Sequence, residues 1–276
     1  MENTSNNQPV QLKIGENAGL TNAQYHSERD HLSSSNLKDL LKDPAKFYQE
    51  KVLGNKPPEE EKPHLLLGSY VHSLVLEPDQ VAQEYAFFEG WRKAGADYKQ
   101  FLAENPGKVV LSKPQADTGQ RLANSVKANP HAIRLLSGGV PELSLASKIL
   151  DVSVKARTDY INIEQGYIFD LKTTSHPTDH EAFKQTVRDY RYDLSAALYC
   201  QIAHDTYGKV FEFYFGVISK ADLGCAVYKA SSATLSTGAA DVIKALVIYK
   251  KCKETGIWDL TSLGKSAIVD DEILEV

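Results

Sequence analysis

In the stretch SKILDVSVKARTDYINIEQGYIFDLKTT (147–174), the spacing of apolar residues changes from that of helices to that of strands. Within 152–160, side chains suited to a core alternate with polar ones, and this period of two is typical of a strand with one buried and one polar face. Gly166 allows the positive φ of a tight turn. The pattern predicts an antiparallel hairpin with three parts: a strand over 147–163, a turn over 164–166 and a returning strand over 167–174.

Charged residues on the polar face of this hairpin suggest a metal site. Asp170 and Lys172 share one face of the returning strand, and antiparallel pairing can bring Asp159 close to Asp170. Two neighbouring carboxylates repel each other unless a cation lies between them, and oxygen ligands suit magnesium or manganese. Lys172 would then place an ammonium beside the ion. The alternative is a cross-strand ladder of salt bridges that also includes Arg157.

Composition limits the classes of protein to which the chain can belong. The 276 residues carry 31 Lys+Arg and 36 Asp+Glu, a formal net charge of −5, so no overall positive field attracts nucleic acid. Apolar residues make up 42% and charged residues 24%, which is ordinary for a globular protein and excludes collagen-like, coiled-coil and wholly disordered chains. Any site for a polyanion must therefore be a local patch.

Targeting signals and cysteine patterns are also missing from the sequence. The first residues have neither a basic segment nor an apolar one, and no apolar run approaches the ~18 residues of a membrane span. The three cysteines form no CxxC pair. We therefore expect a cytoplasmic protein with reduced thiols and no contact with a membrane.

The remaining sequence surrounds the hairpin with helices and further strands. Apolar residues at helical spacing predict helices over 37–48, 64–76, 114–128, 130–136, 194–207 and 240–256, with another starting near Asp179 at a Thr178 and Glu181 capping box. Strand-like segments cover 209–219 and 224–231. This order predicts an α/β fold in which helices flank one central mixed sheet.

The domain organisation follows from the same patterns. Residues 1–24 are rich in Asn, Thr, Gln and Gly and predict a mobile N-terminal arm. Residues 25–258 form the predicted folded domain, and 259–276 an acidic C-terminal tail. Residues 90–107 are polar and aromatic and support no assignment.

Five segments occur in a distinctive order and spacing along the chain: GSYVHSLVLEP (68–78), VPELS (140–144), VKARTDY (154–160), IFDLKTT (168–174) and YRYDLSAALY (190–199). Together they resemble the RecE-type exonuclease group of the PD-(D/E)XK nuclease superfamily, and the resemblance extends from about Tyr25 to Trp258. It implies a restriction-endonuclease-like core. It also implies a Mg²⁺-dependent exonuclease that degrades one strand of linear double-stranded DNA from the 5′ end and leaves single-stranded overhangs for recombination by strand annealing.

The resemblance also assigns roles to residues of the site. Asp159 and Asp170 become metal-binding carboxylates and Lys172 the catalytic lysine. Three further groups join them: the backbone carbonyl of Leu171 and the side chain of His72 as metal ligands, and Glu142 as a catalytic acid. Taken alone, His72 could equally be a core histidine and Glu142 a surface or capping residue. We expect Mn²⁺ to substitute for Mg²⁺.

DNA contacts are expected around the same centre. The candidates are Thr173, Thr174, Arg157, Arg191, Tyr192 and Tyr199, of which Tyr199 fits core packing equally well. Where relatives usually carry a Gln, this chain has Ser195, and Gln185 and Gln201 are nearby replacements.

The resemblance implies partners as well as an activity. We expect double-stranded DNA ends as substrate, a homo-oligomeric ring with a tetramer favoured, and a single-strand annealing protein as companion. The alternatives are a DNA-binding or assembly protein on the same fold whose nuclease activity is lost or regulated, and a structure-dependent flap nuclease.

Overall fold

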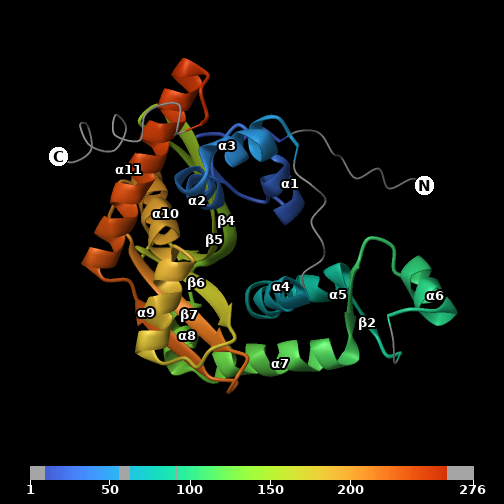
Figure 1. Cartoon of the computed structure of the whole chain (residues 1–276). Coiled ribbons are helices and arrows are strands. Elements are labelled where there is room, and N and C mark those ends of the chain that lie inside the picture. Colours follow the sequence, from blue (N-terminus) through green and yellow to red (C-terminus); the bar gives the residue numbers. More distant parts are fainter. Residues whose placement is uncertain (1–9, 56–62, 91–92, 260–276) are drawn as a thin grey trace.

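A six-stranded sheet in the order β1-β4-β5-β6-β7-β8 runs through the centre of the computed structural model, which describes residues 10–55, 63–90 and 93–259 (Figure 1). Its strands are β1 (Gly15–Asn17), β4 (Val140–Ile149), β5 (Val152–Asn162), β6 (Tyr167–Thr174), β7 (Glu212–Ser219) and β8 (Cys225–Lys229). Neighbouring strands are antiparallel except for β6 and β7, which are parallel. This mixed sheet confirms the predicted fold class.

Helices cover both faces of the sheet. They are α1 (Asn22–Ser27), α2 (Ser34–Lys42), α3 (Pro44–Phe47), a π-helical turn (Tyr48–Val52), α4 (Pro63–Leu76), a 3₁₀ turn (Pro78–Gln80), α5 (Val81–Glu84), α6 (Ala96–Glu104), α7 (Lys113–Ala128), α8 (Pro130–Leu135), α9 (His180–Asp189), α10 (Tyr192–Tyr207) and α11 (Ser232–Thr255). Within the described part of the chain, none of these helices has the length and apolar character that a bilayer crossing requires.

Two apolar layers separate the helices from the sheet. On one face, Leu37 of α2 and Leu198 of α10 join Phe213 of β7 in a fully buried core. On the other face, Val71 of α4 and Leu122 of α7 pack with side chains of β6. The connection from β6 to the parallel strand β7 passes through α9 and α10. It returns the chain to the end of the sheet at which β6 begins.

The predicted hairpin is present, but its first strand is interrupted. Residues 147–163 do not form one strand, because β4 and β5 are joined by a tight turn at Leu150 and Asp151, with φ of 50° and 62°. Ile149 and Val152 pair directly across that turn. Since neither turn residue is the usual glycine or asparagine, the reversal left no sequence signal.

The expectation of a mobile arm over 1–24 is wrong for residues 15–17. These residues form β1 and pair with β4 from Ala146 to Ser144, which gives their backbone groups partners. Just beyond this strand, Lys155 of β5 donates from Nζ to the carbonyls of Tyr25 at 2.7 Å and Glu28 at 2.6 Å. Residues 1–9 and the tail from 260 onward lie outside the described residues, and the domain division stays a prediction.

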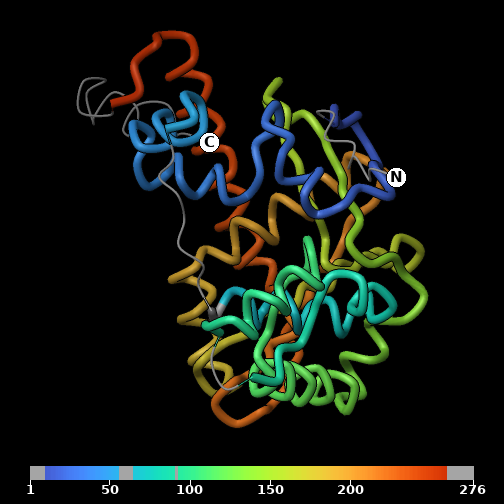
Figure 2. The backbone as a smooth tube through the Cα atoms, turned by 90° about the vertical axis from the view of Figure 1, so that its right-hand side faces the viewer, coloured from blue at the N-terminus to red at the C-terminus, as the bar shows by residue number. Residues whose placement is uncertain are grey.

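A small lobe is formed by β2 (Tyr85–Phe88), α6 and β3 (Val109–Ser112), of which α6 lies in the segment 90–107 that the sequence left unassigned. Strands β2 and β3 pair in parallel, and α6 lies between them in sequence. In Figure 1 this lobe lies on the side of the molecule opposite α11, and in Figure 2 it faces the viewer.

Two smaller differences concern helix starts: α11 begins at Ser232 rather than residue 240, and Asp179 rather than Thr178 caps α9.

Helix α11 packs directly on the backbone at the start of α10 at Gly238. A Cβ atom added there would lie 2.1 Å from the carbonyl oxygen of Asp193 and 2.9 Å from the backbone nitrogen of Leu194. Backbone atoms cannot move aside as a flexible side chain would. The absent side chain therefore fixes the start of α10 against α11.

We expect Gly238→Ala to lower the free energy of unfolding by about 1–3 kcal/mol, because overpacking forces the two helices apart. Urea denaturation measures the change. Ser236→Ala, at an exposed position of the same helix, is the control and should leave stability within about 0.5 kcal/mol. Equal stability of the two variants would contradict the close packing.

Candidate metal centre

Strand register places three carboxylates in one row across the sheet. In β4 and β5, Pro141 pairs with Tyr160 and Leu143 with Thr158, so Glu142 lies opposite Asp159. In β5 and β6, Tyr160 pairs with Phe169, and one further step along both strands sets Asp159 opposite Asp170. The row therefore runs from Glu142 through Asp159 to Asp170.

Helix α4 adds an imidazole to this row. His72 Nδ1 lies 3.5 Å from Asp159 Oδ2, and ligand atoms of His72, Glu142 and Asp159 all lie within 4.8 Å of one another. Gly68, one turn earlier on α4, lets the helix approach β6, since a Cβ there would lie 3.2 Å from Thr173 Oγ1. The structure thus places His72 at the centre rather than in the core.

Asp159 is held in place by the neighbouring strand. Its Oδ2 accepts a hydrogen bond from the backbone nitrogen of Leu171 at 2.7 Å. The carbonyl oxygen of Leu171 accepts a bond from Lys172 Nζ at 3.3 Å. Both backbone groups of Leu171 therefore belong to the centre.

Asp170 is buried beside Asp159 and forms an ion pair with Lys172. Burial raises the pKa of Asp170 to about 6, Lys172 opposes the rise and Asp159 adds to it. Burial alone would lower the pKa of Lys172, but Asp170 and Asp159 outweigh it and hold that pKa above its ordinary value. Lys172 is thus a stable ammonium within the acidic row.

Glu142 has a strained backbone and is held by the half-buried Arg157. Its φ of 52° is left-handed, a conformation that costs a residue with a side chain roughly 1–2 kcal/mol. Arg157 Nε donates to Glu142 Oε2 at 2.7 Å. Burial, followed by Asp159, raises the pKa of Glu142 to about 7 against the opposing effect of Arg157.

Two of the predicted DNA contacts are engaged inside the protein. Arg157 Nη1 donates to the carbonyl of Leu20 at 2.8 Å and to Ser144 Oγ at 3.2 Å, besides its bond to Glu142. Arg191 bonds to Asp193 and Asp241 and thereby joins α10 to α11. Both guanidinium groups already serve internal carboxylates, so their contacts with DNA stay predictions.

The other predicted contacts lie close to the centre. Tyr192 has its ring 5.2 Å from Lys172 Nζ. Tyr199 is half-buried, and burial followed by Asp170 raises the pKa of its hydroxyl, which stays protonated beside the carboxylates. Thr173 and Thr174 are also half-buried, and Thr174 Oγ1 accepts a bond from the backbone nitrogen of His176.

The two glutamines proposed as replacements for the absent amide bond within their own helices. Gln185 donates to Asp189 and Gln201 donates to Asp205. Neither bond points to the carboxylate row.

Lys38 of α2 is a residue of the centre that sequence reasoning missed. Its Nζ lies 5.6 Å from the centre of the Tyr192 ring. Burial and then the neighbouring Lys172 lower the pKa of Lys38 to about 8. On the sequence, Lys38 follows Leu37 on an amphipathic helix and resembles any solvated lysine, so only the tertiary packing identifies it.

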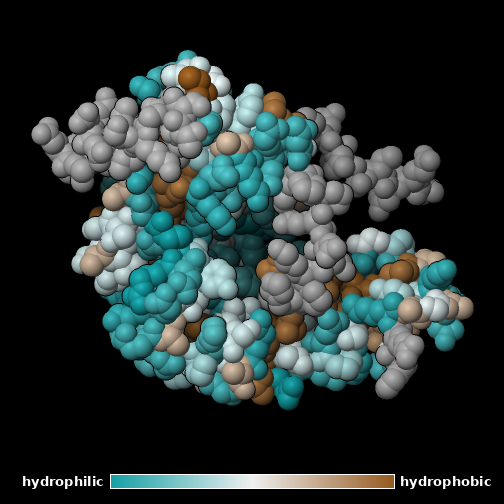
Figure 3. All heavy atoms as spheres, viewed as in Figure 1, coloured by the Kyte–Doolittle hydropathy of each residue, from teal (hydrophilic) through white to brown (hydrophobic). Residues whose placement is uncertain are grey.

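The donor set fits a divalent cation. Carboxylate oxygens and a backbone carbonyl suit magnesium or manganese, and an imidazole suits the transition metal better. Raised pKa values at Glu142 and Asp170 show that negative charge is disfavoured there while no cation is bound. Figure 3 shows a hydrophilic hollow in the middle of this face, where Figure 1 has β5 and β6 between α2 and α4.

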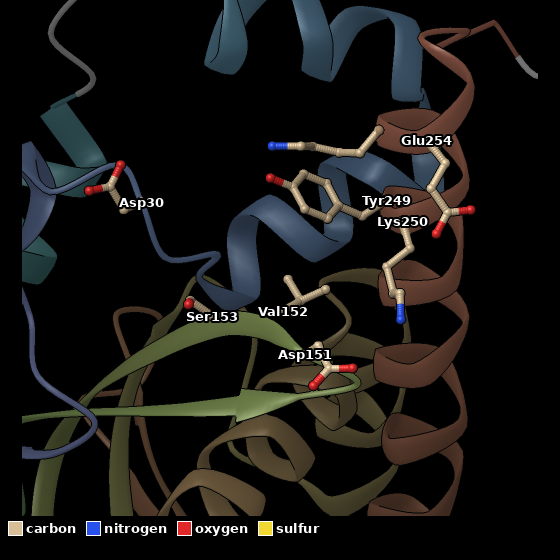
Figure 4. Close-up of a pocket in the computed structure, with 8 residues that line it drawn as sticks. Asp30, Asp151, Val152, Ser153, Tyr249, Lys250 and Glu254 are labelled. Atoms are coloured by element: carbon tan, nitrogen blue, oxygen red, sulfur yellow. The ribbon is translucent and has the colours of Figure 1, made fainter.

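A separate hollow of about 280 Å³ lies at the other end of β5, beside α11 (Figure 4). Its lining consists of Asp30, Asp151, Val152, Ser153, Tyr249, Lys250, Lys253 and Glu254. Both acidic and basic side chains line it, so its charge favours no single class of ligand.

We expect Glu142→Gln to stabilise the metal-free protein at pH 8 by about 1–3 kcal/mol. Because the folded-state pKa of Glu142 is raised, the stability that its neutral form provides is lost as pH rises through about 7. The amide oxygen can still accept the bond from Arg157. Urea denaturation in EDTA at pH 8 and pH 4 measures the effect, which should nearly vanish at pH 4, below the ordinary pKa of a glutamate.

Glu104→Gln, at an exposed position on α6, is the control and should change stability little at either pH. An equal effect of Glu142→Gln at both pH values would show that Glu142 is not electrostatically disfavoured.

Comparison with known proteins agrees with this fold. Residues 33–267 match the family described as "PDDEXK-like domain of unknown function (DUF3799)". The chain is also similar to a crystal structure described as a "Putative exonuclease" from Eubacterium rectale, with 19% identity, a TM-score of 0.61, and coverage of 84% of this chain and 87% of that one.

A crystal structure of SSO0001 is more distant, with 12% identity, a TM-score of 0.28, and coverage of 65% of this chain and 85% of that one. None of the curated proteins matches the sequence. The two better matches support a nuclease with the expected core. By the extent of the family match and the agreement of its fold, the chain belongs to the PDDEXK-like family.

Proposed function

We propose that this protein is a metal-dependent exodeoxyribonuclease that degrades one strand of linear double-stranded DNA, from the 5′ end, with Mg²⁺ as its ion and Mn²⁺ as a substitute. The row of Glu142, Asp159 and Asp170 carries the proposal, because three carboxylates with an imidazole and a lysine form a centre for a cation and a phosphate. Membership of the PDDEXK-like family supports it.

The ligands in this proposal are Asp159, Asp170, the carbonyl of Leu171 and His72, with Glu142 as an added acid. When bound, a divalent cation polarises the scissile phosphate and lowers the pKa of a water molecule. Asp159 is held ready for this role by its bond from the Leu171 nitrogen. Asp170 can exchange its partner Lys172 for the cation.

Lys172 acts as an ammonium in this mechanism. Its raised pKa favours neutralising and orienting a phosphate over removing a proton from water. Once Lys172 is released from Asp170, its Nζ can donate hydrogen bonds to a phosphate oxygen. Lys38 adds a second cation to the same place, and the hydroxyls of Thr173 and Thr174 can donate to neighbouring phosphates.

The choice of an exonuclease rests on similarity rather than on the centre itself. The segments shared with RecE-type exonucleases and the name of the Eubacterium rectale protein both favour it. The same resemblance supports overhang production for strand annealing, an annealing protein as partner and a tetrameric ring. A ring suits a chain of net charge −5, since enclosure retains DNA that the overall charge repels.

One observation favours a second candidate, a DNA-binding protein with weakened nuclease activity. Ser195 stands where relatives usually have a Gln, and neither nearby glutamine bonds toward the centre. The complete set of Asp159, Asp170 and Lys172 favours the active enzyme.

Asp170→Asn should abolish cleavage, because one metal-binding carboxylate is lost while its shape is kept. The assay follows end-labelled linear duplex beside a closed circle, in Mg²⁺, Mn²⁺ and EDTA. The wild-type protein should digest only the linear DNA and only with metal. Asp97→Asn, at an exposed position on α6, is the control.

Wild-type digestion of the closed circle would replace the exonuclease with an endonuclease. Cleavage by a folded Asp170→Asn protein at the parental rate would remove Asp170 from the centre.

Lys172→Met should separate binding from chemistry. The carboxylates and His72 remain, so duplex affinity in Ca²⁺ should fall only a few-fold, whereas single-turnover cleavage in Mg²⁺ should slow about 10²–10³-fold. Lys99→Met on α6 controls for loss of a surface charge. If Lys172 only formed a structural ion pair with Asp170, cleavage would continue at the parental rate.

A further inference from the structure

Two stacked tyrosines lie at the rim of the proposed centre. The rings of Tyr190 and Tyr192 are 5.7 Å apart with an angle of 23° between their planes. Tyr192 is half-buried and stacks in turn on Phe215 of β7 at 6.3 Å. Tyr190 is 63% exposed, which is unusual for so large an aromatic side chain. The pair is thus anchored on one side and open on the other.

The turn between the two rings is fixed by unusual backbone geometry. Arg191 has a φ of 52°, a left-handed conformation that residues with side chains rarely adopt. Its guanidinium bonds to Asp193 and Asp241 hold it there. These contacts hold the backbone between the two tyrosines in place.

Cations lie next to the same pair. Lys172 Nζ and Lys38 Nζ lie 5.2 Å and 5.6 Å from the centre of the Tyr192 ring. Lys172 is paired with Asp170, but no carboxylate of the described residues forms an ion pair with Lys38. An aromatic surface beside an unpaired cation matches the two parts of a nucleotide, a flat base and an anionic phosphate.

We propose that Tyr190 stacks on the base of an unpaired nucleotide at the DNA end while Lys38 binds its phosphate, so the centre prefers an end with a single-stranded extension to a blunt one. This inference rests on the proposed function. A blunt end offers only the outer face of its terminal base pair, whose orientation is fixed by the duplex. An unpaired nucleotide can turn the face of its base to Tyr190 while its phosphate turns to Lys38. The buried Asp170 is also reached more readily by one strand than by two.

The test measures affinity in Ca²⁺ for two duplexes of matched sequence, one blunt and one with a short unpaired 5′ extension. Wild-type protein should bind the extended end more tightly. Tyr190→Ala should weaken binding of the extended end about tenfold, because base–aromatic stacking is worth roughly that factor, and should leave the blunt end nearly unchanged. Tyr190→Phe keeps the ring and should behave as wild type.

Lys38→Gln is the matched probe of the phosphate contact. It should weaken binding of both duplexes equally, since a phosphate contact does not depend on whether the base is paired. Because Tyr190 is exposed, Tyr190→Ala should keep the thermal unfolding temperature of the wild type, which establishes that the variant is folded.

Three results would overturn the inference: no preference for the extended end in the wild type, an unchanged preference in Tyr190→Ala, or equal losses in Tyr190→Phe and Tyr190→Ala. Cleavage of linear duplex in Mg²⁺ is measured on the same preparations. If the wild-type protein cuts linear DNA and one of these results is obtained, the proposed function stands and the inference is wrong. A protein that neither binds nor cuts DNA loses both.

Discussion

Three carboxylates that repel one another lie on adjacent strands, and much of the surrounding structure serves to hold them there. Glu142, Asp159 and Asp170 face one another because the register of β4, β5 and β6 leaves them no alternative. Each is held by a different group: Arg157 bonds to Glu142, the Leu171 nitrogen to Asp159, and Lys172 pairs with Asp170. The raised pKa values of Glu142 and Asp170 show that these partners offset the effects of burial and of repulsion only in part.

The partners of the row extend its influence to distant segments. Arg157 bonds to the Leu20 carbonyl, so the N-terminal segment contributes to the position of Glu142. Lys172 lies beside Tyr192, which is fixed by a turn that Arg191 ties to α11. Both arginines were plausible DNA contacts on the sequence. In the structure they orient groups that face the centre.

Much of the centre could be predicted from the sequence because its residues lie on a strongly periodic hairpin. Alternation along 152–160 identified the face of Asp159, and the family resemblance added His72 and Glu142. The break at Leu150 and Asp151 was missed because Leu is atypical of a positive φ and, although Asp adopts it more often, no glycine or asparagine stands beside it.

Lys38 and β1 were missed for a different reason. A lysine on an amphipathic helix and a three-residue strand in a polar segment acquire their places only through contacts with residues more than a hundred positions away. Local patterns carry no information on such contacts. The same holds for β2 and β3, which are short and pair in parallel across an intervening helix.

Strand β7 follows the three carboxylate-bearing strands in the sequence, and this order bears on when the proposed centre can form during synthesis. Asp170 and Lys172 lie on β6, whose parallel neighbour β7 spans Glu212–Ser219, and α2 with Lys38 packs on α11, which ends at Thr255. Parallel pairing across a long crossover forms slowly because the chain must close a large loop first. A nascent chain on the ribosome would therefore hold every carboxylate of the row before it could assemble them, and the proposed centre would form only after β7 and α11 have been synthesised.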